Sequence, residues 1–384
     1  MHADMVPLIV SGMIFLASLI SLKLGLSVAI VEIVIGAVAG NLGLQPESWM
    51  TYVASLGGIV LTFLAGTEID RKLFKARFLE SFLIGFFSFL IPFIGAGLYA
   101  FYIAGWSLKA SVIAGLALST TSLAVVYSVL VETGLNKEEI GKFLMAATFI
   151  TDMGTVLAMS LIFMKPTFYT LVFIVVSILV VWLATKFSHM IFHHPRLKNK
   201  VIEPEIKYLF LLLFTFVYFA NLGDGHAILP AFIMGLLMSK HFKETSDTKV
   251  LRDRLRTVAY AVITPFFFIV GGMKISLPLV LASLGLFAAL FIVKMIGKFV
   301  GVYFFAKKFI PNGSMYTTLL MSTGLTFGTI SSLYGLNAGI INQLQYSILV
   351  GVVVASAVIP TFIAQQWFVP SHSEDIIEWR DEDE

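Results

Sequence analysis

A single carboxylate stands near the middle of a long apolar run. Asp152 follows Thr151, and Thr148 and Thr155 lie four residues before it and three after it, so a helix would place these two hydroxyls on the face of the carboxylate. Burial favours a neutral carboxyl and a bound cation favours a charged one, so such a group can exchange a proton for a metal ion. The sequence therefore suggests a site for a monovalent cation and a proton. A buried Asp that serves only a structural hydrogen bond or ion pair is the alternative.

Two lysines interrupt another apolar run. Lys294 and Lys298 are four residues apart and share one helix face, and Gly297 and Gly301 have the spacing that lets two helices approach closely. A charge at mid-membrane costs about 2.5–3.5 kcal/mol, so we expect at least one of these amines to act in the electrostatics of the core. Snorkelling of Lys298 to the membrane interface is the alternative.

Glu32 is a third buried-charge candidate, about one and a half turns inside its apolar run. A stabilising role and a transport role are equally compatible with this position. Gly36 and Gly40 follow it and form a second pair of small residues with a spacing of four.

Hydroxyl-rich stretches mark the centres of two other apolar runs. One stretch contains Ser119, Thr120, Thr121 and Ser122. The other contains Ser322, Thr323 and Gly324, followed by further Thr and Gly residues. Hydroxyls can bind backbone groups freed by an unwound turn, so we expect both helices to be broken at mid-membrane. Ordinary hydroxyl bonding within unbroken helices is the alternative.

The composition of the chain excludes a soluble protein. Of its 384 residues, 58% are apolar and 13% are charged, and the apolar residues form runs long enough to cross a bilayer. The chain has no cysteine, which excludes thiolate chemistry, and no phosphate-binding glycine loop, which argues against ATP-driven pumping. We expect a transporter rather than an enzyme, with no cofactor and no nucleic-acid partner.

The sequence predicts an all-α polytopic fold with thirteen transmembrane helices. The expected spans are 6–22, 27–44, 51–69, 79–103, 107–130, 139–163, 167–192, 205–221, 226–239, 257–275, 278–306, 314–335 and 343–368. The two spans with hydroxyl-rich centres are seven apart in order, so they enter from opposite sides. Spans four to six and eleven to thirteen are then inverted repeats, and matched broken helices point to a binding site at the midplane.

Basic residues predict the orientation and the domain layout. The loops on one side carry 21 of the 26 Lys and Arg, whereas the other side carries Lys109, Lys165 and Lys274. This asymmetry places the N-terminus outside and the C-terminus in the cytoplasm of a bacterial or archaeal plasma membrane. We expect one transmembrane unit over 1–370, with a core formed by 79–163 and 278–368 and a scaffold formed by the other spans. An acidic cytoplasmic tail follows at 371–384.

These stretches together resemble the monovalent cation:proton antiporter-2 family over essentially the whole chain. The stretches that match are 32–43, 63–70, 119–122, 151–152, 265–273 and 297–301. The resemblance implies a homodimer in the lipid membrane, with a dimerisation domain and a six-helix core that moves like an elevator. Asp152 looks like the family's essential carboxylate and Lys298 like its buried basic residue. Thr151 stands where electrogenic members have a second acid, which resembles the electroneutral branch.

The favoured interpretation is therefore a secondary antiporter that exchanges Na⁺, K⁺ or Li⁺ for H⁺ by alternating access. A channel-like cation subunit and an organic-anion symporter on the same scaffold are the alternatives. The polar residues cluster between apolar flanks, whereas a channel requires a continuous polar path, and an anion symporter has no need of Asp152. The residue types do not distinguish Na⁺ from K⁺.

Overall fold

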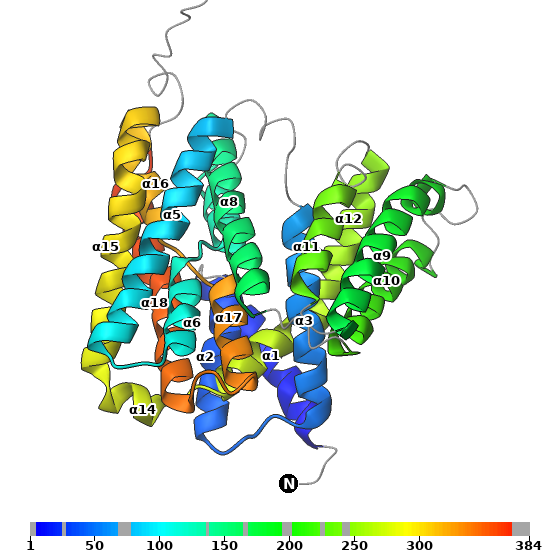
Figure 1. Cartoon of the computed structure of the whole chain (residues 1–384), viewed down its shortest axis with the longest axis horizontal. Helices are drawn as coiled ribbons and strands as arrows, with labels where there is room; N and C mark the ends of the chain where they lie inside the picture. The colour runs from blue at the N-terminus through cyan, green and yellow to red at the C-terminus, as the bar shows by residue number, and fades with distance from the viewer. Residues whose placement is uncertain are drawn as a thin grey trace, which may run out of the picture. The chain divides into compact units, whose positions relative to one another are not determined.

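The computed structural model describes residues 5–24, 28–67, 78–135, 138–163, 168–193, 202–222, 227–239 and 246–370 (Figure 1). Every regular element in these ranges is a helix. The helices follow the thirteen expected spans in order, so the all-α prediction is confirmed. The acidic segment 371–384 lies outside the described residues.

The chain divides into two compact units. The first comprises 1–20, 31–70 and 156–273, and the second comprises 21–30, 71–155 and 274–384. Most of α1 and α2 and the end of α8 belong to the first unit. Its helices are α1 (Met5–Leu24), α2 (Val28–Asn41), α3 (Ser48–Thr67), α9 (Phe168–His193), α10 (Pro204–Leu222), α11 (Ile228–Met238), α12 (Ser246–Val258), the π-helix η4 (Ala259–Ile263) and α13 (Thr264–Met273).

Two apolar clusters hold the first unit together. One gathers buried side chains from α3, α9, α10, α11 and α12, among them Phe63, Phe216 and Leu255. The other joins α1, α3 and α13 through residues such as Met50 and Ile269. Burial of these side chains against one another fixes how the helices of this unit pack.

The second unit contains two sets of helices with the same order. The first set is α5 (Phe78–Leu98) with the π-helix η1 (Tyr99–Ile103), α6 (Leu108–Ser119), α7 (Leu123–Glu132) and α8 (Glu139–Phe163). The second set is α14 (Leu277–Ala282) with α15 (Leu284–Phe309), the short helix η5 (Pro311–Gly313), α16 (Ser314–Met321), α17 (Thr326–Asn337) and α18 (Gln343–Trp367). Each set has a long helix, then an interrupted helix, then another long helix, as the predicted repeats require.

Two of the predicted spans differ in detail from the structure. The tenth begins earlier than expected, because the charged segment of α12 continues through η4 into α13 as one helical run. Leu251 and Leu255 of α12 are buried, so tertiary packing stabilises a segment whose charges suggested a loop. The eleventh span is bent near its start, where Ser283 separates α14 from α15.

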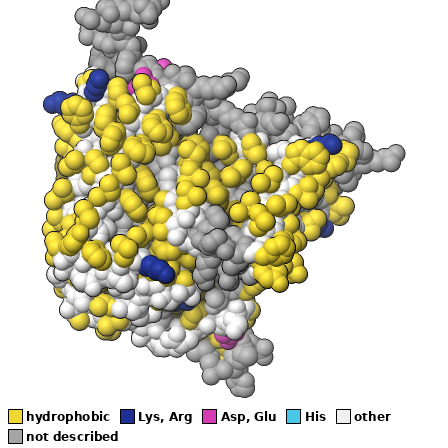
Figure 2. All heavy atoms as spheres, viewed as in Figure 1, with side chains coloured by type: hydrophobic (Ala, Val, Ile, Leu, Met, Phe, Trp, Pro, Cys, Tyr) yellow, Lys and Arg dark blue, Asp and Glu magenta, His cyan; other side chains and the backbone are white. Residues whose placement is uncertain are grey.

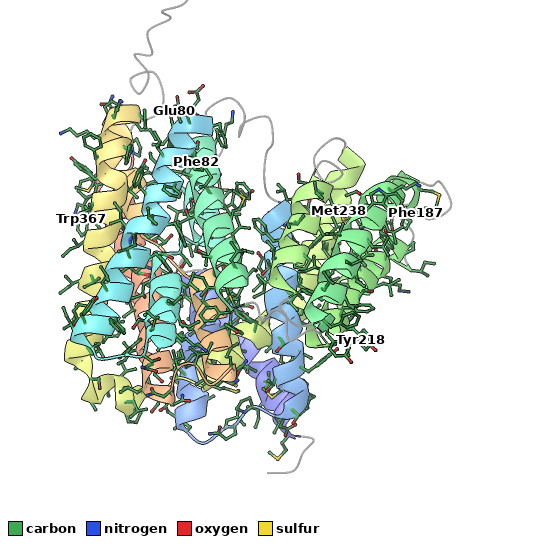
Figure 3. All side chains as sticks on the ribbon, viewed as in Figure 1. Glu80, Phe82, Phe187, Tyr218, Met238 and Trp367 are labelled. Carbon is green, nitrogen blue, oxygen red and sulfur yellow. The ribbon has the colours of Figure 1, made fainter. Side chains whose placement is uncertain are left out.

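The exposed surface of the helices is apolar. In Figure 2, hydrophobic side chains spread over much of the visible described surface, mainly in its upper part, and Lys and Arg occur at only a few places. Six helices have the length and composition to cross a membrane, among them α5, α8, α15 and α18, if only the described residues are considered. Trp367, labelled in Figure 3, is exposed at the end of α18, where aromatic side chains commonly meet the membrane interface.

Glycines allow α5 and α15 to pack with their backbones in contact. A Cβ atom on Gly301 would overlap the carbonyl of Phe87, and one on Gly297 would overlap the backbone of Pro92. The close approach predicted from the spacing of these glycines is therefore confirmed. The same effect brings α2 and α13 together in the first unit, where Gly36 lies against the carbonyl of Ile269.

This contact predicts a specific loss of stability. Gly301→Ala should lower the free energy of unfolding by about 1–3 kcal/mol, because the new methyl group meets a backbone carbonyl that cannot rotate away. The measurement is the thermal midpoint of the detergent-solubilised protein. Gly285→Ala in the same helix is the matched control, since a Cβ there has no neighbour within 4 Å. Equal midpoints for the two variants would contradict the packing argument.

Candidate functional site

The first interruption separates α6 from α7. Thr120 has an extended backbone with φ −66° and ψ 154°, which ends α6 at Ser119. The hydroxyls of Ser119 and Thr120 donate to the carbonyls of Leu116 and Ala117, and thus bind groups near the open end of α6. The Ser122 hydroxyl accepts from the backbone N–H of Val125 at 3.5 Å in the first turn of α7. The hydroxyl-rich stretch breaks the helix, as its sequence predicts.

The second interruption separates α16 from α17. The Ser322 and Thr323 hydroxyls donate to the carbonyls of Thr318 and Leu320, each at 2.7 Å. Leu325, with φ −138° and ψ −70°, precedes the first residue of α17. Both predicted breaks are therefore present.

The two interruptions bind each other. The backbone N–H of Ser122 donates to the carbonyl of Thr323 at 3.1 Å, and the Thr121 hydroxyl donates to the carbonyl of Met321 at 2.8 Å. These bonds satisfy backbone groups that neither helix can satisfy alone.

The interrupted helices run in opposite directions. Thr133, just after α7, has its hydroxyl 3.2 Å from that of Tyr316 in the first turn of α16. Gly335 near the end of α17 lies against Ile113 in α6, the first half of the other interrupted helix. The start of each helix therefore lies beside the end of the other, as the inverted repeat predicts.

Lys298 reaches the first interruption from α15. Its fully buried amine donates to the hydroxyls of Ser88 on α5 and Thr121, both at 2.9 Å. The sequence predicted that at least one of the two lysines acts in the electrostatics of the core but left open which, and Lys298 lies at the first interruption. Because α5 and α15 touch through Gly297 and Gly301, the amine extends past α5 to the Thr121 hydroxyl.

Lys294 lies at the second interruption. A Cβ atom on Gly324 would overlap the Lys294 amine and come within 2.9 Å of the Thr120 hydroxyl. The amine is fully buried and has no hydrogen-bond partner among the described residues. The two lysines thus serve different interruptions, and only Lys298 is held by side-chain hydroxyls.

Asp152 is buried on α8, with one carboxylate oxygen, Oδ1, that has no hydrogen-bond partner among the described residues. Thr151 and Thr155, both fully buried, donate to backbone carbonyls of α8, and Thr148 donates to the Met321 sulfur at 3.5 Å. A hydroxyl that donates its hydrogen keeps lone pairs on its oxygen, so these threonines remain able to bind a cation. Thr148 also ties α8 to the second interruption.

The site contains one acidic side chain and two basic side chains. The Asp152 carboxylate attracts the Lys298 amine, which is repelled by Lys294, and all three residues are buried. One acid and two bases are thus buried in the second unit. In the described part of the chain, no group of three or more His, Cys, Asp or Glu side chains is placed to hold a metal ion.

Glu32 belongs to a different unit from the other three buried ionisable residues. Glu32 is buried in the first unit, whereas Asp152, Lys294 and Lys298 belong to the second. Two contributors to the site escaped the sequence analysis, namely Ser88 and Met321. A single Ser or Met within an apolar span is common, so only the packing of α5 against α15 and of α8 against α16 identifies them.

Comparisons with known proteins agree with this geometry. The chain is 27% identical to the probable Na⁺/H⁺ antiporter 3 of Methanocaldococcus jannaschii over 360 residues, which covers 89% of this chain and 90% of that protein. It is 24% identical to the Na⁺/H⁺-K⁺ antiporter GerN of Bacillus cereus, with 90% of each chain covered.

The fold also matches a solved structure, that of the sodium proton antiporter MjNhaP1 from Methanocaldococcus jannaschii. The TM-score is 0.69 over 96% of this chain and 99% of that one, at 16% sequence identity, so the likeness concerns the fold. The family model described as the transmembrane sodium/hydrogen exchanger matches residues 10–369. The crossed, interrupted helices thus lie in a chain that belongs, over nearly its whole length, to the transmembrane sodium/hydrogen exchanger family.

Proposed function

We propose that this protein exchanges Na⁺ for H⁺ across the membrane and that Asp152 binds the two ions alternately. The observation that carries the proposal is the buried Asp152 carboxylate, whose Oδ1 has no hydrogen-bond partner among the described residues and which lies on the helix tied to the second interruption. A carboxylate in such a place is stable either as the neutral acid or with a bound cation. Competition of the two ions for one group couples their movements.

We propose that the other ligands of the ion come from hydroxyl groups on α8 and in the first interruption. Thr148, Thr151 and Thr155 supply hydroxyl oxygens along α8, and the hydroxyls of 119–121 lie in the first interruption. Carboxylate, hydroxyl and carbonyl oxygens bind both Na⁺ and K⁺. The names of the relatives include both ions, so K⁺ and Li⁺ belong in the assay beside Na⁺.

The division of the chain supports alternating access. Asp152, Lys294, Lys298 and both interruptions lie in the second unit, so this unit can carry the ion as one body. We propose that the second unit is the transport core and that the first is the scaffold of a homodimer. The proposed orientation has the N-terminus outside and the C-terminus in the cytoplasm of a bacterial or archaeal plasma membrane.

Neutralisation of the binding carboxylate should abolish exchange. Asp152→Asn keeps the size of the side chain and removes its charge, so the variant should express and fold but show no cation-dependent proton flux in proteoliposomes with a pH dye. Asp253→Asn is the matched control, because it makes the same substitution at an exposed position on α12. This variant should retain exchange. Robust Na⁺-driven proton flux in Asp152→Asn would disprove the assignment.

Exchange should be electroneutral. One carboxylate carries one monovalent cation in one direction and one proton in the other, because Thr151 supplies no second acid. The initial rate after a Na⁺ pulse should therefore stay the same when valinomycin and K⁺ impose different membrane potentials. A rate that changes with the imposed potential would show that Lys294 or Lys298 exchanges a further proton.

Lys298 should stabilise the protein more than Lys294 does. Lys298→Gln loses two hydrogen bonds from a charged donor, each worth about 1.5–3 kcal/mol, whereas Lys294 forms none within the described residues. The thermal midpoint should fall more for Lys298→Gln than for Lys294→Gln, and exchange should remain measurable in both. If Lys298→Gln keeps its midpoint and loses exchange, Lys298 belongs to the transport cycle instead.

A further inference from the structure

Ser88 lies between the two helices that carry the opposite charges of the site. On one side, Gly85 and Phe89 of α5 lie against α8, the helix of Asp152. On the other side, Phe87 and Pro92 of α5 lie against Gly301 and Gly297 of α15, the helix of Lys298. Ser88 is fully buried, so its hydroxyl has no access to water.

The Lys298 amine bonds to hydroxyls although a carboxylate attracts it. The amine donates to the hydroxyls of Ser88 and Thr121, at 2.9 Å each, and neither acceptor is the carboxylate of Asp152. Attraction to Asp152 acts on the amine at the same time. In a region of low dielectric, an ammonium that loses a neutral acceptor is drawn more strongly towards a carboxylate that attracts it.

The two hydroxyls that hold the amine are not equivalent. Thr121 also donates to the carbonyl of Met321, so its substitution would disturb the contact between the two interruptions. Ser88 stands on the long helix α5 and belongs to neither interruption. Removal of its hydroxyl should therefore act on the Lys298 amine and little else.

We propose that Ser88 is a positioning residue that holds the Lys298 ammonium off Asp152 and so keeps the carboxylate open to Na⁺. Without this hydroxyl the amine pairs with the carboxylate and competes with the cation for it. The inference rests on the proposed exchange of Na⁺ for H⁺ at Asp152. It adds a residue that sets the affinity for the cation without touching the cation.

The test compares the apparent KM for Na⁺ of wild type and Ser88→Ala in proteoliposomes. The KM should rise about tenfold, which corresponds to about 1.4 kcal/mol, while the maximal rate is kept. Ser81→Ala is the matched control, because Ser81 is buried on the same helix two turns earlier and its hydroxyl has no partner among the described residues. Its KM should equal that of wild type.

Two further variants separate positioning from packing. Ser88→Cys keeps the shape of the side chain with a weaker acceptor, so its KM should lie between those of wild type and Ser88→Ala. In a Lys298→Gln background, Ser88→Ala should cause no further change, because the group it positions is gone. The Na⁺ concentration that gives half of the maximal thermal stabilisation provides the same comparison where transport is too slow to measure.

The possible outcomes distinguish a failure of the Ser88 inference from a failure of the proposed function. If wild-type protein shows no Na⁺-driven proton flux, the proposed function fails. If wild type exchanges ions and Ser88→Ala has an unchanged KM, only the role of Ser88 is overturned. An equal rise in Ser81→Ala, or an undiminished effect of Ser88→Ala in the Lys298→Gln background, would likewise overturn it, because either result indicates a packing defect.

Discussion

The interruptions of α6–α7 and α16–α17 bind each other's backbone, and the rest of the second unit is arranged around that contact. Within a membrane no water can satisfy a free N–H or carbonyl group, so a broken helix needs partners inside the protein. Here Ser122 donates its N–H to the carbonyl of Thr323, and Thr121 donates its hydroxyl to the carbonyl of Met321. Hydroxyls of the same stretches bind further carbonyls of their own helices. Each break is therefore stable only in the presence of the other.

This contact also determines where charges are tolerated. Helix ends that meet inside a membrane carry partial charges, and a buried amine or carboxylate beside them is less costly than one beside lipid. Lys298 reaches the first interruption through Thr121, Lys294 lies at Gly324 of the second, and Thr148 ties the helix of Asp152 to Met321. The three ionisable groups and the two breaks thus form one connected cluster.

The cluster has one acid and two bases, and its hydrogen bonds are distributed unevenly. Lys298 is held by two hydroxyls, while the Lys294 amine and the Asp152 Oδ1 atom have no hydrogen-bond partner among the described residues. A carboxylate oxygen without a partner is costly unless it takes a proton or a cation. In the proposed function that cost is the physical basis of exchange, since each ion that leaves must be replaced by the other. The contact between α5 and α15, made possible by Gly297 and Gly301, places the hydroxyl of Ser88 where it accepts from the Lys298 amine.

The sequence alone determined the helices, the two breaks and the ionisable groups of the site, because these features follow from local composition. Apolar runs specify spans, and a hydroxyl-rich stretch at the centre of such a run marks where side chains can bind freed backbone groups. The tertiary structure alone decided which lysine serves which interruption, that Glu32 belongs to the other unit, and that Ser88 and Met321 join the site. Lys294 and Lys298 share one helix face, so their spacing cannot tell which of them reaches Thr121. That assignment depends on the depth at which α15 packs against α5, which is set by contacts between residues about two hundred positions apart in the chain.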